Sequence, residues 1–247
     1  MKVVILAGGR GSRLDEETKD IPKPMVKIGG KPILWHIMQI YSFYGIKDFI
    51  ICCGYKSNII KNYFDKSFFL KKNKWNIRLV NTGIRTATGG RLKKIEKIIS
   101  KEKFFHFTYG DGVSNLNIKK LINFHIKHKK LATVTAVRPP GRYGVLNIKK
   151  NLIVKNFSEK KRGGDGYING GFFILSPKVI KYIKNDNTIW EKEPMQKLSK
   201  IKQLIAFKHQ DFWQSMDTYR DKLELEKIWK AKYEKTKKID NARFKIW

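Results

Sequence analysis

Acidic side chains are scarce in this sequence of 247 residues. Asp and Glu number 21 against 53 Lys and Arg, which gives a formal net charge of +32. A charge of this size ordinarily suggests a nucleic-acid partner or an anionic surface. The lysines are, however, interleaved with Ile and Asn along the whole chain instead of being gathered in one tail or on one helix face. We therefore interpret the charge as a solvated basic surface that also suits an enzyme of anionic substrates, with a basic nucleic-acid-binding protein as the alternative.

Cysteines and long apolar runs are also few. The two cysteines, Cys52 and Cys53, are adjacent in FIICCGY, so they cannot form a framework of disulfides, and we expect inert buried thiols in a reducing cytoplasm. No apolar run approaches the length of a membrane-spanning helix. The first run is too short, before Gly8 and Arg10, to be a signal peptide. We accordingly expect a cytoplasmic protein without a membrane partner.

The histidines do not form a recognisable metal centre or catalytic group. His125 and His128 fall on one expected helix without a further ligand, and we interpret them as part of its solvated face. No Ser-His-Asp or Cys-His arrangement is evident, and neither cysteine has the neighbours that activate a thiolate. The sequence therefore argues against nucleophilic catalysis.

Short apolar runs alternate with amphipathic segments over the first 137 residues. This alternation predicts an α/β fold, in which a doubly wound, mostly parallel (Rossmann-like) sheet carries helices on both faces. Ligands on such sheets bind at the carboxyl ends of the strands. The expected strands are 2–6, 48–53, 75–80, 103–112 and 131–137, and the expected helices are 32–44, 57–66, one beginning near 91, and one through 118–125.

The pattern becomes less regular after residue 137. Segments 139–148, 152–160 and 166–175 resemble short strands of a smaller mixed or antiparallel part, and a helix is expected over 218–230. No low-complexity linker interrupts the chain. We predict one domain over residues 1–230, with a regular part at about 1–137 and a smaller part at about 138–217, and a charged tail at 231–247.

A glycine-rich turn follows the first expected strand, in VILAGGRGSRL. Glycines let a backbone approach a ligand closely and present its N–H groups to phosphates. The turn is neither a Walker motif nor a dinucleotide fingerprint, and taken alone it could be an ordinary strand-to-helix turn. Two cations favour a polyphosphate site: Arg13 ends the turn, and Lys23 stands between Pro22 and Pro24, which fix the backbone on either side.

Two aspartates follow apolar segments. Asp111 in TYGDG comes at the end of an expected strand and could bind Mg²⁺, which prefers oxygen ligands and substrate phosphates, or could simply form an Asp-Gly turn. Asp217 in FWQSMDTYRD could be a second metal ligand or the N-cap of the helix that follows.

Several motifs together resemble the sugar-1-phosphate nucleotidyltransferase family. LAGGRGSRL followed by PKPM resembles the signature of the whole family. ICCGY, FTYGDG, TGGRLKK, INGGFF and FWQSMDTYRDK are similar to its bacterial cytidylyltransferase branch, which acts on glucose 1-phosphate, and the resemblance extends to about residue 230. It implies transfer of CMP from CTP to α-D-glucose 1-phosphate with release of pyrophosphate, and it makes residues 1–137 the nucleotide-binding part and residues 138–217 the sugar-binding part. The CDP-glucose formed would serve dideoxysugars of bacterial lipopolysaccharide (O-antigen).

The resemblance also implies the site residues. Asp111 and Asp217 match the Mg²⁺ ligands, and Arg13, Lys23 and Asp111 are the expected catalytic residues. The expected nucleotide-binding residues are Leu6, Ala7, Gly8, Gly9, Arg10, Gly11, Ser12, Arg13, Lys23, Thr86, Arg91 and Gly110. The expected sugar-phosphate-binding residues are Lys160, Tyr143, Gly144, Asn169 and Gly170. We expect CTP and glucose 1-phosphate as partners, no nucleic acid, and a homo-oligomer.

This sequence departs from the family pattern at a few places. The segment 64–75 is shorter than expected, Lys161 replaces the usual proline after Lys160, and Arg10 adds a cation to the glycine-rich turn. The shortened segment leaves base and sugar selectivity open, so UTP or dTTP with another sugar 1-phosphate is an alternative substrate pair.

Overall fold

The computed structural model describes residues 1–9, 11, 14–65, 73–139, 145–148, 152–158 and 166–237. The described strands are β1 (Lys2–Ala7), β2 (Lys27–Ile28), β3 (Lys31–Pro32), β4 (Asp48–Cys53), β5 (Asn76–Asn81), β6 (Phe105–Tyr109), β7 (Gly112–Ser114), β8 (Ala132–Val137), β9 (Val145–Ile148), β10 (Val154–Ser158), β11 (Ile168–Leu175), β12 (Leu204–His209) and β13 (Trp213–Ser215). The described helices are α1 (Asp15–Thr18), α2 (Ile33–Phe43), α3 (Ser57–Asp65), α5 (Thr88–Lys94), α6 (Glu96–Ile99), α7 (Ile118–His128), α8 (Glu193–Lys200) and α9 (Tyr219–Lys237), with two 3₁₀ segments, η2 (Lys23–Met25) and η3 (Pro177–Tyr182).

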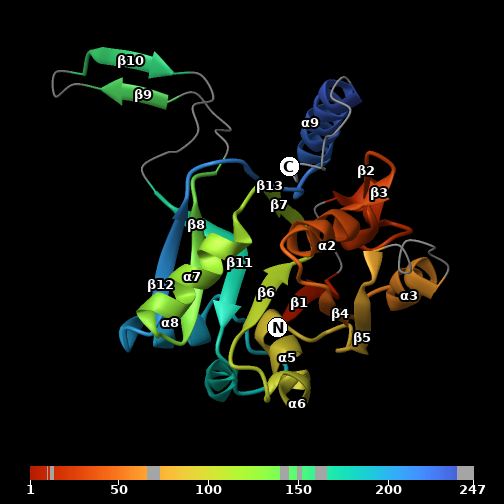
Figure 1. The fold of residues 1–247 in the computed structure, drawn as a ribbon. Helices are drawn as coiled ribbons and strands as arrows, with labels where there is room; N and C mark the ends of the chain where they lie inside the picture. Colours follow the sequence, from red (N-terminus) through yellow and green to blue (C-terminus); the bar gives the residue numbers. More distant parts are fainter. Residues whose placement is uncertain are drawn as a thin grey trace.

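One sheet of seven strands forms the centre of the molecule, in the order β12-β8-β11-β6-β1-β4-β5 (Figure 1). β1 pairs in parallel with both β4 and β6, β4 pairs in parallel with β5, and β12 pairs in parallel with β8. β11 is inserted between β6 and β8 and runs antiparallel to both. The expected doubly wound, mostly parallel sheet is confirmed.

Apolar side chains cover both faces of this sheet. In β1, Val3 and Ile5 pack on one face, in a cluster that includes residues of α2, α3 and α7. Val4 and Leu6 pack on the other face, in a cluster that includes residues of α5, α6, η3 and α8. Successive side chains of a strand point to opposite faces, so a strand buried on both faces is apolar over its buried length, as β1 is from Val3 to Ala7. The two helical layers hold the sheet rigid beneath its loops.

The strands of the predicted smaller, mixed or antiparallel part lie in two places. β9 and β10 form their own antiparallel pair, whereas β11 and β12 belong to the central sheet. The helix expected over 218–230 begins at Tyr219 and continues to Lys237, so the expected tail begins as helix. The helix expected near Arg91 begins at Thr88.

The burial of the two cysteines and of His125 can be compared with the predictions from sequence. Cys52 and Cys53 are buried and free, and burial raises their pKa values to about 12 and about 11, so the prediction of inert core thiols is confirmed. The prediction of a solvated His125 is wrong, because its side chain is buried and its Nδ1 lies 2.8 Å from the Thr133 hydroxyl. Within the described residues, none of the helices combines the length and the apolar character needed to cross a bilayer.

Candidate active site

A cleft of about 1210 Å³ opens at the carboxyl edge of the sheet. Its wall is built by residues that end or follow β1 and β6, by the start of α5, by β11, and by the segment from β13 into α9. In doubly wound sheets this edge is where ligands bind, because the loops there join strands whose ends converge. The cleft is large enough for a nucleotide and a second small substrate.

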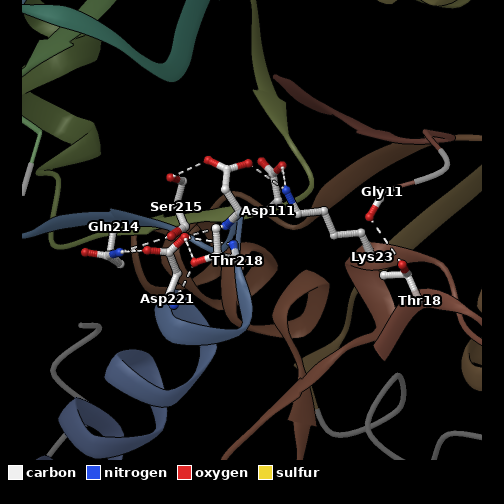
Figure 2. Close-up of polar contacts among 9 residues, drawn as sticks. Gly11, Thr18, Lys23, Asp111, Gln214, Ser215, Thr218 and Asp221 are labelled. Atoms are coloured by element: carbon white, nitrogen blue, oxygen red, sulfur yellow. Dashed lines mark hydrogen bonds and ion pairs between the residues drawn. The ribbon is translucent and has the colours of Figure 1, made fainter. Parts of the chain in front are cut away.

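Lys23 and two aspartates form an ion cluster at this cleft, which we call the carboxylate cluster. The Lys23 Nζ lies 2.7 Å from Asp111 Oδ2 and 2.9 Å from Asp217 Oδ1. Asp111 and Asp217 both line the cleft, and the Lys23 side chain is 10% exposed. Figure 2 shows Lys23 reaching from its own segment toward Asp111. Because both carboxylates contact one ammonium, residues that are 106 positions apart in the chain can share a single cation.

The local backbone explains how these three side chains meet. Pro22 and Pro24 flank Lys23, and the residue lies in the short 3₁₀ segment η2. β7 and β13 pair antiparallel, with Gly112 opposite Ser215, and the Met216 N–H donates to the Asp111 carbonyl at 2.8 Å. This pairing fixes Asp111 and Asp217 next to each other at the ends of two short strands.

The start of α9 is capped by residues next to Asp217 and not by the Asp217 side chain. The carboxylate of Asp221 accepts hydrogen bonds from the backbone N–H and the hydroxyl of Thr218, at 2.8 and 2.9 Å, and thereby closes the first turn of α9 (Figure 2). Gln214 Nε2 donates to the other oxygen of Asp221 at 3.2 Å. Asp217 directs one carboxylate oxygen to Lys23 and the other to the Ser215 hydroxyl, which donates at 2.9 Å. Thr218 and Asp221 thus stabilise the helix start, and the Asp217 carboxylate faces the cluster.

The charge of Lys23 depends on its two partners. Burial, the largest single influence, lowers the pKa of this lysine, but the charges and hydrogen bonds of Asp111 and Asp217 outweigh it and raise the pKa above its usual value. Lys23 therefore remains an ammonium.

The donor set fits a magnesium ion. Two carboxylates that can approach one cation supply hard oxygen ligands, and Mg²⁺ commonly takes one or two carboxylates together with waters and substrate phosphates. Within the described part of the chain, no group of three or more His, Cys, Asp or Glu side chains could hold a metal by itself. A metal at Asp111 and Asp217 would accordingly depend on oxygens from substrate and water.

The glycines of the first turn are required by two neighbouring basic side chains. A Cβ at Gly8 would lie 2.0 Å from Arg91 Nη1, and a Cβ at Gly11 would lie 2.8 Å from the Cβ of Lys23. Gly11 also has a φ of +71°, which side-chain-bearing residues rarely adopt. Glycine at these positions lets the turn pass directly over Arg91 and Lys23.

Arg91 is buried beneath this turn, and its four hydrogen-bond acceptors define what we call the arginine cluster. Its guanidinium donates to the carbonyls of Gly8, Cys53 and Gly83 at 2.9, 3.2 and 2.9 Å, and to the Thr82 hydroxyl at 2.6 Å. These acceptors follow or end β1, β4 and β5, so one side chain joins the ends of three parallel strands. Burial lowers the pKa of Arg91, but a guanidinium stays protonated in proteins.

The structure places several other expected nucleotide-binding residues at or near the same cleft. Leu6, Gly9 and Thr86 line it, and Ala7 ends β1. Gly110 lies where β1 and β6 approach closely, because a Cβ there would be 2.5 Å from the Leu6 carbonyl. Arg10, Ser12 and Arg13 lie outside the described residues.

Two of the expected sugar-phosphate residues, Asn169 and Gly170, belong to β11 and line the cleft. The indole N–H of Trp213 donates to the Gly170 carbonyl at 2.7 Å, which joins β11 to β13. The other expected sugar-phosphate residues, Tyr143, Gly144 and Lys160, lie outside the described residues, as does Lys161.

Three polar residues near the cleft were missed by the sequence interpretation. Tyr109 and Thr88 line the cleft, and both donate hydrogen bonds to Glu191. Glu191 lies between η3 and α8, 82 residues from one partner and 103 from the other. A single glutamate so far along the chain from its partners gives no signal that sequence patterns could detect.

The chain matches known proteins over nearly its whole length. The nucleotidyl transferase family matches residues 2–237. The chain is 53% identical to the glucose-1-phosphate cytidylyltransferase of Salmonella typhimurium, over 93% of this chain and 96% of that protein. It is 42% identical, over the same shares, to a probable glucose-1-phosphate cytidylyltransferase of Bacillus subtilis.

A solved structure shares the fold as well. HddC from Yersinia pseudotuberculosis, complexed with GMP-PN, is 31% identical with a TM-score of 0.70, over 92% of this chain and 99% of HddC. Sequence and structure agree on the same relationship: this chain belongs to the nucleotidyl transferase family.

Proposed function

We propose that this chain transfers CMP from CTP to α-D-glucose 1-phosphate and gives CDP-glucose and pyrophosphate by in-line displacement. The observation that carries the proposal is the carboxylate cluster, in which Asp111 and Asp217 meet at Lys23 on the wall of a cleft large enough for both substrates. The substrate pair is supported by the 53% identity to the Salmonella enzyme.

In this reaction a phosphate oxygen of glucose 1-phosphate attacks the α-phosphorus of CTP, the bond from that phosphorus to the bridging oxygen of the β-phosphate breaks, and pyrophosphate leaves. The attacking oxygen is already an anion, so no general base is needed. None of the described residues that line the cleft is a histidine, in keeping with this chemistry. Such transfers depend on positioning and on neutralising charge.

Lys23 is suited to neutralise that charge. Two prolines flank this residue in the chain, and its ammonium is held by Asp111 and Asp217, which line the cleft. A preorganised cation stabilises developing negative charge without reorganising during the reaction. Arg13, as its place in the family motif implies, would serve the departing pyrophosphate with a planar set of donors.

Asp111 and Asp217 would hold Mg²⁺, which supplies Lewis-acid stabilisation of the phosphate oxygens when bound. The glycine turn from Gly8 and the side chain of Thr86 would contact the nucleotide. Arg91 fixes that turn through the Gly8 carbonyl. Asn169 and Gly170, with Tyr143, Gly144 and Lys160, would receive the sugar phosphate.

The reaction belongs in the cytoplasm under this proposal, where Cys52 and Cys53 remain free thiols. The test is a panel in which CTP, UTP, dTTP and GTP are each combined with several sugar 1-phosphates, and released pyrophosphate is measured. We expect the highest kcat/KM for CTP with glucose 1-phosphate. A clear preference for another nucleotide or another sugar phosphate contradicts the assignment, and salt-sensitive DNA binding without any turnover favours the nucleic-acid alternative.

A further inference from the structure

A chain of hydrogen bonds crosses the sugar side of the cleft and ends on a carboxylate behind it. Glu191 Oε2 accepts from the Thr88 hydroxyl at 2.6 Å, and Glu191 Oε1 accepts from the Tyr109 hydroxyl. Tyr109 Oη in turn accepts from Asn169 Nδ2 at 3.1 Å, and Asn169 Oδ1 accepts from the Gly171 N–H at 2.8 Å. Thr88, Tyr109 and Asn169 line the cleft, whereas Glu191 is not among its lining residues.

The direction of each bond in this chain follows from its two ends. A carboxylate only accepts, so the Tyr109 hydroxyl must give its proton to Glu191 and offer a lone pair to its other neighbour. A backbone N–H only donates, so the atom of Asn169 next to Gly171 must be its oxygen. The Asn169 nitrogen therefore faces Tyr109, with a second N–H left for a ligand. Glu191 thus sets the direction of the Tyr109 hydroxyl, and this hydroxyl and the Gly171 N–H together orient the Asn169 amide.

The ring of Tyr109 is held in place independently of its hydroxyl. Phe107 and Phe173 pack against it edge-on, with ring centroids 5.8 and 6.0 Å away. Gly171, with a φ of +76°, lies so close that a Cβ there would be 2.7 Å from Tyr109 Cδ2. Burial, followed by the charge of Glu191 and their hydrogen bond, raises the pKa of Tyr109, so the hydroxyl keeps its proton. Packing fixes the ring, and Glu191 fixes the hydroxyl.

Glu191 itself is held from both sides. Trp190, the preceding residue, is fully buried in the core beneath the sheet, and its backbone N–H donates to the Thr88 hydroxyl oxygen at 2.9 Å. Thr88 therefore receives one bond from this segment and returns another to Glu191. This reciprocal pair fixes the segment before α8 against the start of α5.

We propose that Glu191 is a positioning residue for the sugar phosphate: by accepting the proton of Tyr109, it keeps the lone pair of that hydroxyl on the Asn169 amide, which is thereby held, together with the Gly171 N–H, in place to donate a hydrogen bond to a sugar hydroxyl. This inference rests on the proposed function, because it assigns the Asn169 side of the cleft to the sugar. The wall it creates consists of neutral donors and acceptors, which suits the hydroxyls of a sugar ring better than a phosphate. The carboxylate cluster serves the phosphates, and this wall serves the sugar.

The first test is Glu191→Gln. Glutamine keeps the size of the side chain but has one acceptor oxygen, so one of the two hydroxyls must reverse its hydrogen bond. A reversed Tyr109 hydroxyl points its proton at the Asn169 nitrogen, which cannot accept it, so the amide loses this support and is held by the Gly171 N–H alone. We expect the KM for glucose 1-phosphate to rise about tenfold, as for the loss of one hydrogen bond to the substrate. The KM for CTP stays within about twofold. Glu193→Gln is the matched control, because Glu193 forms an exposed ion pair with Lys184, and it leaves both KM values unchanged.

The second test is Tyr109→Phe, alone and combined with Glu191→Gln. Phenylalanine keeps the packed ring and removes only the hydroxyl through which Glu191 acts. We expect the single variants to raise the KM for glucose 1-phosphate equally, and the double variant to be no worse than either, because residues in one network are not additive. If Glu191→Gln does not fold, Tyr109→Phe decides the question alone.

An unchanged KM for the sugar phosphate in a folded variant overturns the inference, as does an equal rise in both KM values or full additivity in the double variant. All variants are compared on the nucleotide and sugar 1-phosphate that the wild-type protein uses best. A wild-type preference for another pair overturns the proposed function, and the comparison of variants still decides the role of Glu191.

Discussion

Two basic side chains are buried at the carboxyl edge of the sheet, and their surroundings differ in charge. Lys23 in the carboxylate cluster contacts two carboxylates, whereas Arg91 in the arginine cluster donates to three carbonyls and a hydroxyl, all neutral. A metal cation can take the place of the Lys23 ammonium on the two carboxylates, because both are positive. A phosphate can take the place of a carboxylate on Lys23, because both are negative. The bonds of Arg91 hold strand ends together and have no such substitute. Under the proposed function, the carboxylate cluster takes part in the reaction, and the arginine cluster supports the strand ends beneath it.

Removing a carboxylate is expected to have the largest effect. In Asp111→Asn the amide keeps the shape but loses the charge that would bind a divalent metal, so kcat should fall at least about a hundredfold, as for the loss of a preorganised electrostatic group. Steady-state kinetics with CTP and glucose 1-phosphate measure it. Asp48→Asn is the control, because Asp48 pairs with Lys2 at the opposite end of the sheet, and it should leave kcat within about twofold. Near-wild-type turnover in folded Asp111→Asn would remove Asp111 from the chemistry.

Arg91→Met tests the supporting side of the comparison. The substitution removes the charged donor from the carbonyls of Gly8, Cys53 and Gly83. Gly8 and Cys53 keep bonds from the N–H groups of Tyr55 and Thr82, but the links that the guanidinium makes between the strand ends are lost, so the free energy of unfolding should fall by about 3 kcal/mol. Denaturation in urea measures this change. Arg85→Met, six residues earlier and exposed, should change the free energy by less than about 0.5 kcal/mol. An unchanged stability in Arg91→Met would show that the strand ends do not need this guanidinium.

Three buried histidines extend the comparison to stability in acid. No carboxylate among the described residues offsets the effect of burial on their pKa values. Burial lowers the pKa of His36 and His125 to about 4 and of His106 to about 3. The unfolded chain takes up protons below about pH 6.5 that the native protein excludes, so stability is complete above that pH and is lost as the pH falls toward 4.

The expected slope is about 1.4 kcal/mol per pH unit for each histidine. Denaturation of the wild type and of His125→Gln at pH 7, 6 and 5 measures this slope. The slope of the variant should be smaller by the contribution of one histidine, about 1.4 kcal/mol per pH unit. Equal slopes in the two proteins would contradict the assignment of His125 as a neutral buried side chain.

The smallest expected effect concerns metal and lysine at the same place. In Lys23→Met, Asp111 and Asp217 face each other without the ammonium that neutralises them. Adding Mg²⁺ should then raise the melting temperature about 2 °C more than in the wild type, where Lys23 competes for the same oxygens. Thermal denaturation with and without MgCl₂ measures the difference. An equal or smaller rise in the variant would show that lysine and metal do not share the carboxylates.

Much of the nucleotide side could be predicted from sequence, because its information is local. β1, β4 and β6 are short apolar runs, and the turns that follow carry their glycines and Asp111 within a few residues. Lys23 could be selected because two prolines flank it. Its contacts with both aspartates could not be derived from spacing alone, and it was the family resemblance that paired Asp111 with Asp217.

The sugar side was predicted less completely because its contacts are distant in sequence. β11 forms an ordinary apolar strand, and nothing local indicates that it enters the central sheet between β6 and β8. Glu191 acts on residues of two earlier elements, and His125 looks exposed on a helix rich in lysine until Thr133 of β8 is placed beside it. These features depend on tertiary packing, which local periodicity does not encode.

The antiparallel direction of β11 has a consequence for how this scaffold can vary. Val137, the last residue of β8, pairs with Ile168, the first residue of β11. The segment between them, residues 138–167, therefore leaves and re-enters the sheet at one place on the rim of the cleft. Insertions, deletions or replacement of this segment, which carries the β9–β10 pair, can change the rim of the cleft while every strand of the central sheet keeps its neighbours. Under the proposed function, changes in this one segment would alter the preference for the acceptor and leave the carboxylate cluster and the first glycine turn unchanged.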